Sequence, residues 1–315
     1  MKDDVFLLER VAWLYHVAKK TQQEIADMLN VSRSKVSRML QEAERKGIVE
    51  SRVKLRNHQY FPEMELELTS LFHLRDCLVI PTLEEDRVGF FADAAAQYVE
   101  RIIEEGDILG VAWGWTLKEV FSRFKTEKDL SSITIVQLLG GLSSEGPEMN
   151  LYDITQYFPG AKRYYLYAPA IVSFPETKKY LVIEPQIHKV FEMMSRIDKA
   201  FLGVGDMSTE ASLLKAGFVT AQQMNELIEA GAVGDVVGRY FDLEGRPVKT
   251  EMDERIIGIT LEQLRNIPLR VGIALGERKI KALVGALRGG YINALITDYA
   301  TALGVIKTER LGRQK

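Results

Sequence analysis

A short stretch near the N-terminus collects polar side chains that can bind nucleic acid, and it holds no acidic one. These side chains are Arg33, Ser34, Lys35, Ser37 and Arg38. In a helix through this stretch, Val36, Met39 and Leu40 repeat at i, i+3 and i+4 and would face a core. The five polar side chains then point largely outward, where each can hydrogen-bond phosphate oxygens or base edges. The spacing therefore predicts a helix that reads DNA.

Two helices must position these side chains, and local patterns predict where both begin. Thr21 and Glu24 have the spacing of a capping box that starts the first helix, with Gln22 in its first turn. Asn30 stands where the chain must turn, because asparagine tolerates the left-handed backbone, and Ser32 is an N-cap for the second helix. The pattern predicts a helix-turn-helix over 21–43, with Gln22 and Ser32 among its DNA contacts. An ordinary helical hairpin with a basic, solvated face is the alternative.

Residues 48–55 alternate as a strand does and add two cations. Arg52 and Lys54 fall on the same face of this strand. A basic β-wing beside the helices would add phosphate contacts, so both side chains are predicted to contact DNA. An edge strand whose charges prevent aggregation would explain the pattern equally well.

Charge divides the chain into a basic head and an acidic body. Residues 1–58 hold twelve Lys/Arg against eight Asp/Glu, a balance of +4, whereas the rest holds 29 against 36, a balance of −7. This asymmetry is typical of a DNA-binding head on a cytosolic effector domain. The polar stretch 57–62 marks the linker. We expect a winged helix-turn-helix domain at 1–57 and an effector and oligomerisation domain at 58–315.

The composition is that of a cytoplasmic globular protein. Hydrophobic residues make up 46% and charged residues 27% of the 315 positions. No apolar run approaches the roughly eighteen residues of a membrane span, and acids stand where a signal peptide would be basic. The one cysteine, Cys77, lies in an apolar segment and is predicted to be a buried small hydrophobe.

A helix is predicted at about 63–73, directly after the linker. Pro62 suits its first turn. Operators read by paired helix-turn-helix units are usually two-fold symmetric, so we expect a homo-oligomer, a dimer or a tetramer. The apolar side chains predicted to pack between subunits are Met64, Leu66, Leu68, Leu71 and Phe72.

From residue 76 onward, short apolar runs alternate with helical stretches. The strands are continuous runs of Val, Ile and Leu, which favours a parallel sheet covered on both faces. The fold class is therefore α/β, with a doubly wound, Rossmann-like domain that binds ligands at the carboxyl ends of its strands. Expected strands are 77–80, 107–113, 133–141, 164–169, 199–205, 269–275 and 293–297, and expected helices are 88–104, 116–124, 176–197 and 279–287.

Three of these strand ends offer groups that suit an anion. The loop that contains Gly114, Trp115 and Thr116 leads into a helix, whose N–H groups and dipole would face an anion. Lys279 opens a later helix, where the dipole opposes its charge unless an anion is also present. The next strand after the first loop ends in the same manner, with Gln137, Gly140 and Gly141. Glycines that serve only packing, and a solvated lysine, are the alternatives.

Two further segments place charged side chains beside glycines in apolar surroundings. Asp235 could accept hydrogen bonds from sugar hydroxyls, or it could only cap the chain or pair with Arg239. Arg288, beside Gly289 and Gly290, offers the same ambiguity. The Walker lysine signature and the dinucleotide GxGxxG are both absent, so no nucleotide is implied.

The sequence resembles the SorC/DeoR-type family of sugar-binding transcriptional regulators. The motifs that carry the resemblance are TQQEIADMLNVSRSKVSRML, DILGVAWGWTL, VQLLGG, GAVGDVVGRYFD and GERKIKALVGALRGGYINALITD, spread over about residues 5–306. The resemblance implies an effector domain with the fold of glucosamine-6-phosphate deaminase and ribose-5-phosphate isomerase, commonly in tetramers. Carried over by motif, it implies phosphate contacts from Gly114, Trp115, Thr116 and Lys279, and sugar contacts from Gln137, Asp235 and Arg288.

The expected function is a DNA-binding regulator of a carbohydrate-metabolism operon, controlled by a phosphorylated sugar and binding double-stranded operator DNA. No catalysis, cofactor or metal is expected. The rival is a sugar-phosphate isomerase-like enzyme that carries a DNA-binding head. Its chemistry needs a carboxylate or imidazole as base, and the four histidines are scattered, although Asp206 and Asp235 are conceivable bases. The strand end 137–141 holds no lysine to capture an aldehyde, so non-covalent binding is expected.

Overall fold

The chain divides into two compact units, residues 1–58 and residues 59–315. The computed structural model describes residues 2–49, 61–83, 87–141, 154–215 and 217–313. The predicted wing with Arg52 and Lys54, and most of the predicted linker, lie outside the described residues.

The N-terminal unit contains three helices, α1 (Lys2–His16), α2 (Gln22–Leu29) and α3 (Arg33–Arg45). The Thr21 hydroxyl accepts from the Glu24 N–H at 3.2 Å, and the Glu24 carboxylate accepts from the Thr21 N–H at 2.8 Å. Asn30 takes the left-handed conformation at φ 49° and ψ 47°. Ser32 Oγ accepts from the Lys35 N–H at 3.2 Å. The predicted helix-turn-helix is confirmed in its helices, its caps and its turn.

A small apolar core holds these helices together. Val11 of α1, Ile25 of α2, and Val36 and Ala43 of α3 are fully buried. Burying a Val or Ile side chain stabilises a fold by roughly 1.5–3 kcal/mol. Because α1 and α2 both pack against α3, the core fixes the side of α3 that stays in solvent.

The described residues of the larger unit build a seven-stranded parallel sheet in the order β1-β10-β9-β5-β2-β3-β4. After β2 the chain moves outward to β3 and β4, and it then returns to place β5 on the other side of β2. The direction of winding thus reverses between β2 and β5, which is where ligands bind in such sheets. The predicted doubly wound α/β fold is confirmed. The strands are β1 (Asp76–Ile80), β2 (Ile108–Val111), β3 (Thr134–Gln137), β4 (Lys162–Tyr164), β5 (Lys199–Gly203), β9 (Leu269–Ile273) and β10 (Ala294–Asp298).

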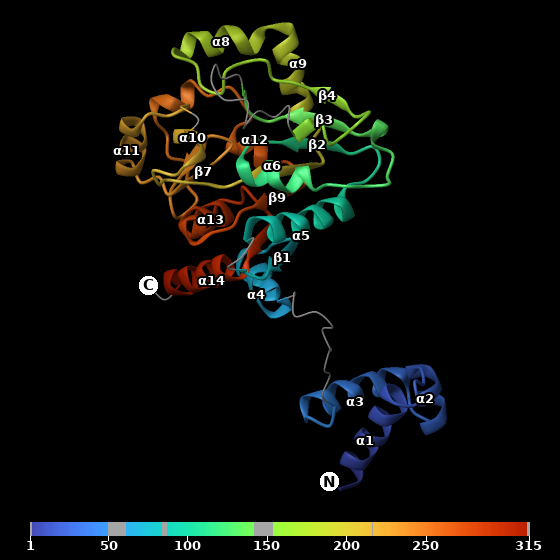
Figure 1. The fold of residues 1–315 in the computed structure, drawn as a ribbon. Coiled ribbons are helices and arrows are strands. Elements are labelled where there is room, and N and C mark those ends of the chain that lie inside the picture. The colour runs from blue at the N-terminus through green and yellow to red at the C-terminus, as the bar shows by residue number, and fades with distance from the viewer. Residues whose placement is uncertain (1, 50–60, 84–86, 142–153, 216, 314–315) are drawn as a thin grey trace. The chain divides into compact units, whose positions relative to one another are not determined.

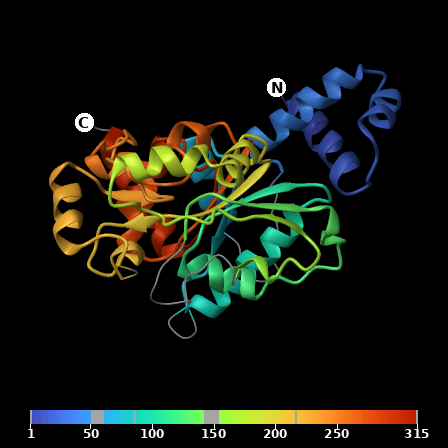
Figure 2. The ribbon, with the colours of Figure 1, turned by 90° about the horizontal axis from the view of Figure 1, so that it is seen from above.

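Helices cover both faces of this sheet (Figure 2), and α5 and α6 lie side by side on one of them (Figure 1). Val111, Val136, Phe201 and Ile273 of the strands are fully buried between the layers. No helix among the described residues is both long and apolar enough to cross a membrane. The helices are α4 (Pro62–Phe72), α5 (Arg87–Ile102), α6 (Trp115–Ser122), α8 (Pro175–Ile183), α9 (Pro185–Met194), α10 (Ser212–Lys215), α11 (Ala221–Glu229), α12 (Leu261–Arg265), α13 (Ile280–Arg288) and α14 (Tyr299–Arg313).

A small antiparallel sheet lies beside the main one and was missed by the sequence analysis. Its strands are β6 (Gly205–Asp206), β7 (Gly234–Val236) and β8 (Arg239–Phe241). Strands of two or three residues are too short to show an alternating pattern. This sheet matters because it carries Asp206 and Asp235.

Most predicted elements differ from the structure by up to four residues at their ends, and two differ more. The helix expected over 176–197 is two helices, because Pro185 lacks an N–H and forces Glu184 into an extended conformation with ψ 129°. The strand expected over 164–169 is β4, which ends at Tyr164. Cys77 is buried, as predicted, and burial raises the pKa of its thiol.

Helix α4 is partly covered by its own unit, and this corrects the expectation for one of its apolar side chains, Leu68. Leu68 is fully buried, and Met64, Leu71 and Phe72 pack partly against the same core. Leu66 is the most exposed of the five, at 69%. The helix begins at Pro62, as predicted.

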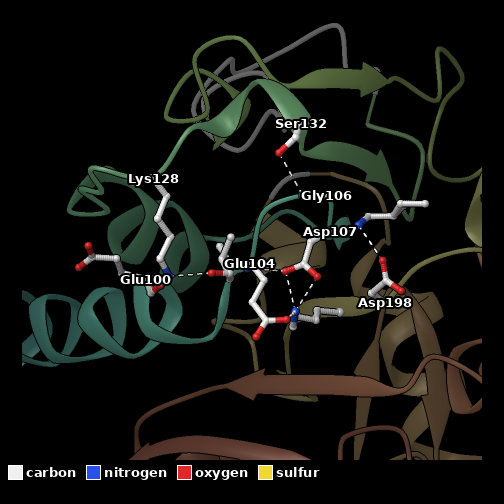
Figure 3. Close-up of polar contacts among 10 residues, drawn as sticks. Glu100, Glu104, Gly106, Asp107, Lys128, Ser132 and Asp198 are labelled. Atoms are coloured by element: carbon white, nitrogen blue, oxygen red, sulfur yellow. Dashed lines mark hydrogen bonds and ion pairs between the residues drawn. The ribbon is translucent and has the colours of Figure 1, made fainter.

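A charged cluster ties together the amino ends of β2, β3 and β5 (Figure 3). Lys199 Nζ lies 2.6 Å from both carboxylate oxygens of Asp107, and these two side chains are only 14% and 8% exposed. The Asp198 carboxylate accepts from the Ile108 N–H at 2.9 Å, and Ser132 Oγ accepts from the Gly106 N–H at 3.0 Å. These bonds hold β2 in register with its neighbours at the edge opposite to the predicted ligand site.

Replacing Lys199 with alanine should lower the free energy of unfolding by roughly 3 kcal/mol, because it leaves the Asp107 carboxylate buried without its cation. Urea unfolding of the full chain would measure this. The double variant Lys199→Met/Asp107→Leu should regain at least half of the loss, because neither charge is then buried alone. The expected loss is roughly 3 kcal/mol, so a free energy of unfolding for Lys199→Ala within about 1 kcal/mol of the wild-type value would contradict this account.

Candidate functional site

The DNA contacts predicted on α3 gather on its exposed side. Arg33, Ser34, Lys35 and Arg38 are exposed and Ser37 is half-buried, whereas Val36 faces the core. Ser32 is also exposed, but its hydroxyl caps the helix and lies 3.0 Å from Ser34 Oγ. The side chains of α3 therefore form one polar surface, in which Ser32 also stabilises the helix that carries the others.

A basic groove at the start of α2 adds cations that the sequence analysis did not name. Lys19 takes a left-handed conformation at φ 56°, and Lys20 pairs with Glu24 at 3.4 Å. The helix dipole favours an anion, such as a DNA phosphate, at the N-terminus of α2. The two lysines directly before the capping box could have revealed this groove from the sequence. It is lined by Tyr15, His16, Lys19, Lys20, Thr21, Gln22, Gln23 and Arg33.

The larger unit holds a cleft at the carboxyl ends of β2, β5 and β9. These strands are neighbours in the sheet, and the cleft lies where the winding reverses. Its walls come from Ala112–Leu117 after β2, Gly203–Gly205 after β5, and Ile273, Ala274 and Lys279 after β9, together with Leu139, Ser212, Leu213, Asp235, Val237 and Gly238. Two loops that the sequence singled out, 110–116 and 276–279, therefore meet here.

Five of the predicted effector contacts line this one cleft: Gly114, Trp115, Thr116, Asp235 and Lys279. Gly114 is the N-cap of α6 and has no side chain with which to cap the helix. The first N–H groups of α6, and its dipole, are thus available at the cleft wall to an anion. Trp113 forms a buried part of the wall, with its indole N–H 3.2 Å from Gly140 O and its ring 4.9 Å from that of Phe218.

The predicted effector contacts Gln137, Gly140 and Gly141 are not among the residues that line the cleft. The Gln137 side chain is buried, and its oxygen accepts from the Leu166 N–H at 2.8 Å. Gly140 allows a close approach of backbones, since a Cβ there would lie 2.5 Å from Pro169 O. The contacts seen for Gln137 and Gly140 hold the loop after β3 in place.

Arg288 lies at the far end of α13 from Lys279, and this corrects the expectation that it contacts the sugar. Its guanidinium bonds the Glu309 carboxylate at 2.8 Å, the Glu244 carboxylate at 2.7 Å and Leu243 O at 3.2 Å. Arg288 therefore ties α13 to α14 and to the turn after β8, and it is absent from the cleft lining.

Three charged side chains lie together at the cleft. Lys279 Nζ donates to Val204 O at 2.6 Å and lies 3.5 Å from the Asp206 carboxylate. Burial raises the pKa of Asp235 to about 6, although the Gly238 N–H, at 3.0 Å, and the Lys279 charge oppose this rise. Burial would also raise the pKa of Asp206, but hydrogen bonds from Ser208 and the Lys279 charge outweigh it and lower that pKa. One carboxylic acid is thus poised to change its charge near neutral pH beside one that stays ionised.

The turn between β7 and β8 stores backbone strain at the cleft. Val237 has φ 51° and Gly238 has φ 72°, the positive angles that a two-residue hairpin turn requires. A β-branched residue in this conformation costs on the order of 1–3 kcal/mol. The Asp235–Gly238 bond holds the turn, and Gly205 leaves room for the carboxylate, since a Cβ there would lie 1.8 Å from Asp235 Oδ1.

The predicted alternative that Asp235 pairs with Arg239 is wrong. The Arg239 guanidinium donates to the Asp253 carboxylate at 2.9 Å and not to Asp235. Its other bonds run to the backbone oxygens of Asp253, Ile256, Gly258 and Ile259. Asp235 is therefore left to face the cleft. Among the described residues, no group of three His, Cys, Asp or Glu side chains could hold a metal ion.

Two family models match this chain. The one described as "Putative sugar-binding domain" matches residues 59–307, and the one described as "Crp-like helix-turn-helix domain" matches residues 6–60. The boundary between the two matches falls where the chain divides into its two units.

The chain is similar to regulators along nearly its whole length. It is 34% identical to the uncharacterized transcriptional regulator YjhU of Escherichia coli, over 92% of this chain and 91% of that protein. It is 31% identical to the deoxyribonucleoside regulator of Bacillus subtilis, over 94% of this chain and 95% of that protein. Its structure matches that of the full-length sorbitol operon regulator SorC from Klebsiella pneumoniae with a TM-score of 0.74 and 25% identity, covering 96% and 99% of the two chains.

Asp235→Asn should stabilise the fold increasingly as the pH rises from 4.5 to 7.5. Between pH 3.8 and about 6, folded Asp235 keeps a proton that the unfolded chain has lost, so the stability of the wild type falls across this window and is constant with respect to this group above it. Asparagine carries no charge, and the gain over the wild type should reach about 2–3 kcal/mol above pH 6. Thermal unfolding at both pH values would measure it.

Asp206→Asn is the matched control, and it should act in the opposite direction. Because the folded pKa of Asp206 is lowered, its charge stabilises the fold above the unfolded pKa, and this contribution is lost as the pH falls through the folded pKa. The control should therefore be less stable than the wild type at pH 7.5. A gain from Asp235→Asn that does not change with pH would refute the assignment.

Proposed function

The chain belongs to the SorC/DeoR-type family of sugar-binding transcriptional regulators, and from this membership we propose that it is a DNA-binding regulator of a carbohydrate-metabolism operon, controlled by a phosphorylated sugar. The observation that carries the effector proposal is the meeting of the α6 N-terminus, Lys279 and Asp235 in one cleft. The observation that supports DNA binding is the exposed polar face of α3, which follows a capped helix and a left-handed turn.

A phosphorylated sugar suits both halves of the cleft. The N–H groups of α6 at Gly114–Leu117 and the Lys279 ammonium provide positive potential for a phosphate. Asp235 can donate a hydrogen bond to a sugar hydroxyl when protonated and accept one when ionised.

Binding is proposed to be non-covalent. The segment 137–141 holds no lysine, and the lysine that does line the cleft, Lys279, is engaged with Val204 O and the Asp206 carboxylate. An ammonium held in this way is not a nucleophile, because covalent capture of an aldehyde requires the free amine.

We propose that the chain is a regulator and not a sugar-phosphate isomerase-like enzyme. The relatives named above are transcriptional regulators by name. Of the histidines that the structure describes, His16 lies in the N-terminal unit, His73 ends α4 and His188 is exposed on α9, and none lines the cleft. Asp206 and Asp235 are the side chains that an isomerase could use as base, and we propose that neither supports turnover here.

A homo-oligomer is part of the same proposal. Helix-turn-helix units usually bind two half-sites of a symmetric operator, which requires paired reading helices. Leu66 on α4 is 69% exposed and offers one apolar contact for a second copy.

Arg38→Ala should weaken DNA binding by about 1–3 kcal/mol, which is roughly 5- to 150-fold, if the arginine contacts a base edge. The probe is a duplex selected from a random library by the wild-type protein, and the measurement is a gel-shift titration. Arg45→Ala is the control, because Arg45 is 78% exposed in the last turn of the same helix. Equal losses of DNA affinity from both substitutions, or no loss from Arg38→Ala, would show that Arg38 does not contact DNA specifically.

Lys279→Ala should abolish the rise in melting temperature that a sugar phosphate causes in the wild type. The panel is ribose 5-phosphate, fructose 6-phosphate, glucosamine 6-phosphate and sorbitol 6-phosphate, with each parent sugar beside it. A ligand at about 100 times its Kd stabilises the fold by about 2.7 kcal/mol, which sets the size of the shift. Lys281→Ala removes an exposed lysine two residues further on and should keep the response. Equal responses from the wild type and Lys279→Ala would contradict the site.

A further inference from the structure

The first turn of α14 is bonded to the loop that carries Lys279. The Gly276 N–H donates to Thr301 Oγ1 at 2.8 Å and to the Asp298 carboxylate at 3.3 Å. The Thr301 hydroxyl in turn donates to Asp298, and both side chains are buried. Lys279 follows within one turn, and its N–H donates to Gly276 O at 2.9 Å. The position of Gly276, and with it the start of the Lys279 turn, therefore depends on α14.

A second contact joins α14 to the residue that follows Lys279. Gly304 packs so closely on Ile280 that a Cβ at residue 304 would lie 2.2 Å from Ile280 Cδ1. Only glycine allows this approach without a shift of the Ile280 side chain. The loop 276–279 thus lies between two fixed points on α14, and a displacement of one should displace the other.

The other side of α14 is fastened to α4 along its length, and the two helices lie together in Figure 1. The Tyr299 ring packs on that of Phe61, with centroids 4.7 Å apart. Arg310 pairs with Glu67 at 2.6 Å, and Arg313 Nη2 donates to Leu71 O at 2.6 Å. Phe61 is the first described residue after 50–60, the stretch that joins the two units.

Asp298 is the junction of these contacts. Besides Thr301 and Gly276, its carboxylate accepts from Arg87 Nη2 at 2.6 Å and from Thr82 Oγ1 at 2.9 Å. Thr82 Oγ1 also accepts from the Ala300 N–H at 2.9 Å. A carboxylate that is 2% exposed and has donors from the segment after β1, from α5, from α14 and from the cleft loop fixes all four against one another.

We propose that α14 couples the cleft to α4, with Asp298 and Thr301 as the residues that position the Lys279 loop at one end and Tyr299 as the contact to Phe61 at the other. This inference rests on the proposed function of the cleft. A phosphate bound by Lys279 changes the energy of the 276–279 turn. Through its contacts with both, α14 couples this turn to α4, the first helix after the stretch that joins the two units in the sequence. The coupling is a property of the folded chain, so it is present without a ligand.

Hydrogen exchange of the full-length protein, with neither DNA nor sugar phosphate present, tests the coupling. Gly276→Ala strains the loop directly, because Gly276 has φ 106° and open space around its Cα. Thr301→Val removes the hydroxyl that holds Gly276 and keeps the shape of the side chain. Gly231→Ala is the control, because Gly231 ends α11 with φ 94° and equally open space.

Both Gly276→Ala and Thr301→Val should speed the exchange of the α4 amides by roughly fivefold, the effect of losing about one hydrogen bond. Gly231→Ala should leave α4 at its wild-type rates. Unchanged exchange in α4 for both loop variants would overturn the proposal, and so would an equal acceleration in all three variants. Because no ligand or operator is present, failure here is separate from failure of the proposed effector or DNA site.

Discussion

The larger unit is arranged around three charges that must stay together in a partly buried cleft: Lys279, Asp206 and Asp235. A charge removed from water is costly unless it is paired or hydrogen-bonded. The sheet meets this constraint by ending β5 and β9 beside each other, which brings the Val204 carbonyl and Asp206 to Lys279. The hairpin of β7 and β8 then holds Asp235 over Gly205, where only a glycine leaves room. A ligand with a phosphate and hydroxyl groups would find its partners already in place.

In a regulator whose DNA binding depends on a ligand, the N-terminal unit binds DNA and the larger unit binds the ligand. The N-terminal unit needs only its own core and caps to present the polar face of α3. The larger unit needs its sheet to assemble the cleft. Its helix α4 is the first helix after the stretch that joins the two units in the sequence. A ligand can alter DNA binding only if it interacts differently with the states that bind and release DNA. The bonds of Asp298 and Thr301 to the Lys279 loop are where such a difference could arise.

Features set by neighbours in the chain could be predicted from the sequence, and features set by distant partners could not. The caps at Thr21, Asn30 and Ser32 depend on residues within a turn and formed as predicted. The strands followed from apolar runs, and their parallel order then brought Gly114 and Lys279 to one edge of the sheet. Arg288 was misplaced because its partners, Glu244 and Glu309, lie 44 and 21 residues away. The break at Pro185 was readable from the sequence and was missed.

The most direct test of conditional DNA binding is the affinity of the full-length protein for its selected duplex, measured with and without the sugar phosphate that stabilises it. Allosteric coupling of about 1–3 kcal/mol corresponds to a change of roughly 5- to 150-fold in the Kd for DNA, and linkage requires the same factor in the affinity for the sugar phosphate when DNA is present. The account predicts a change in this range, in either direction, with that reciprocity. An identical Kd for DNA at saturating sugar phosphate would contradict it.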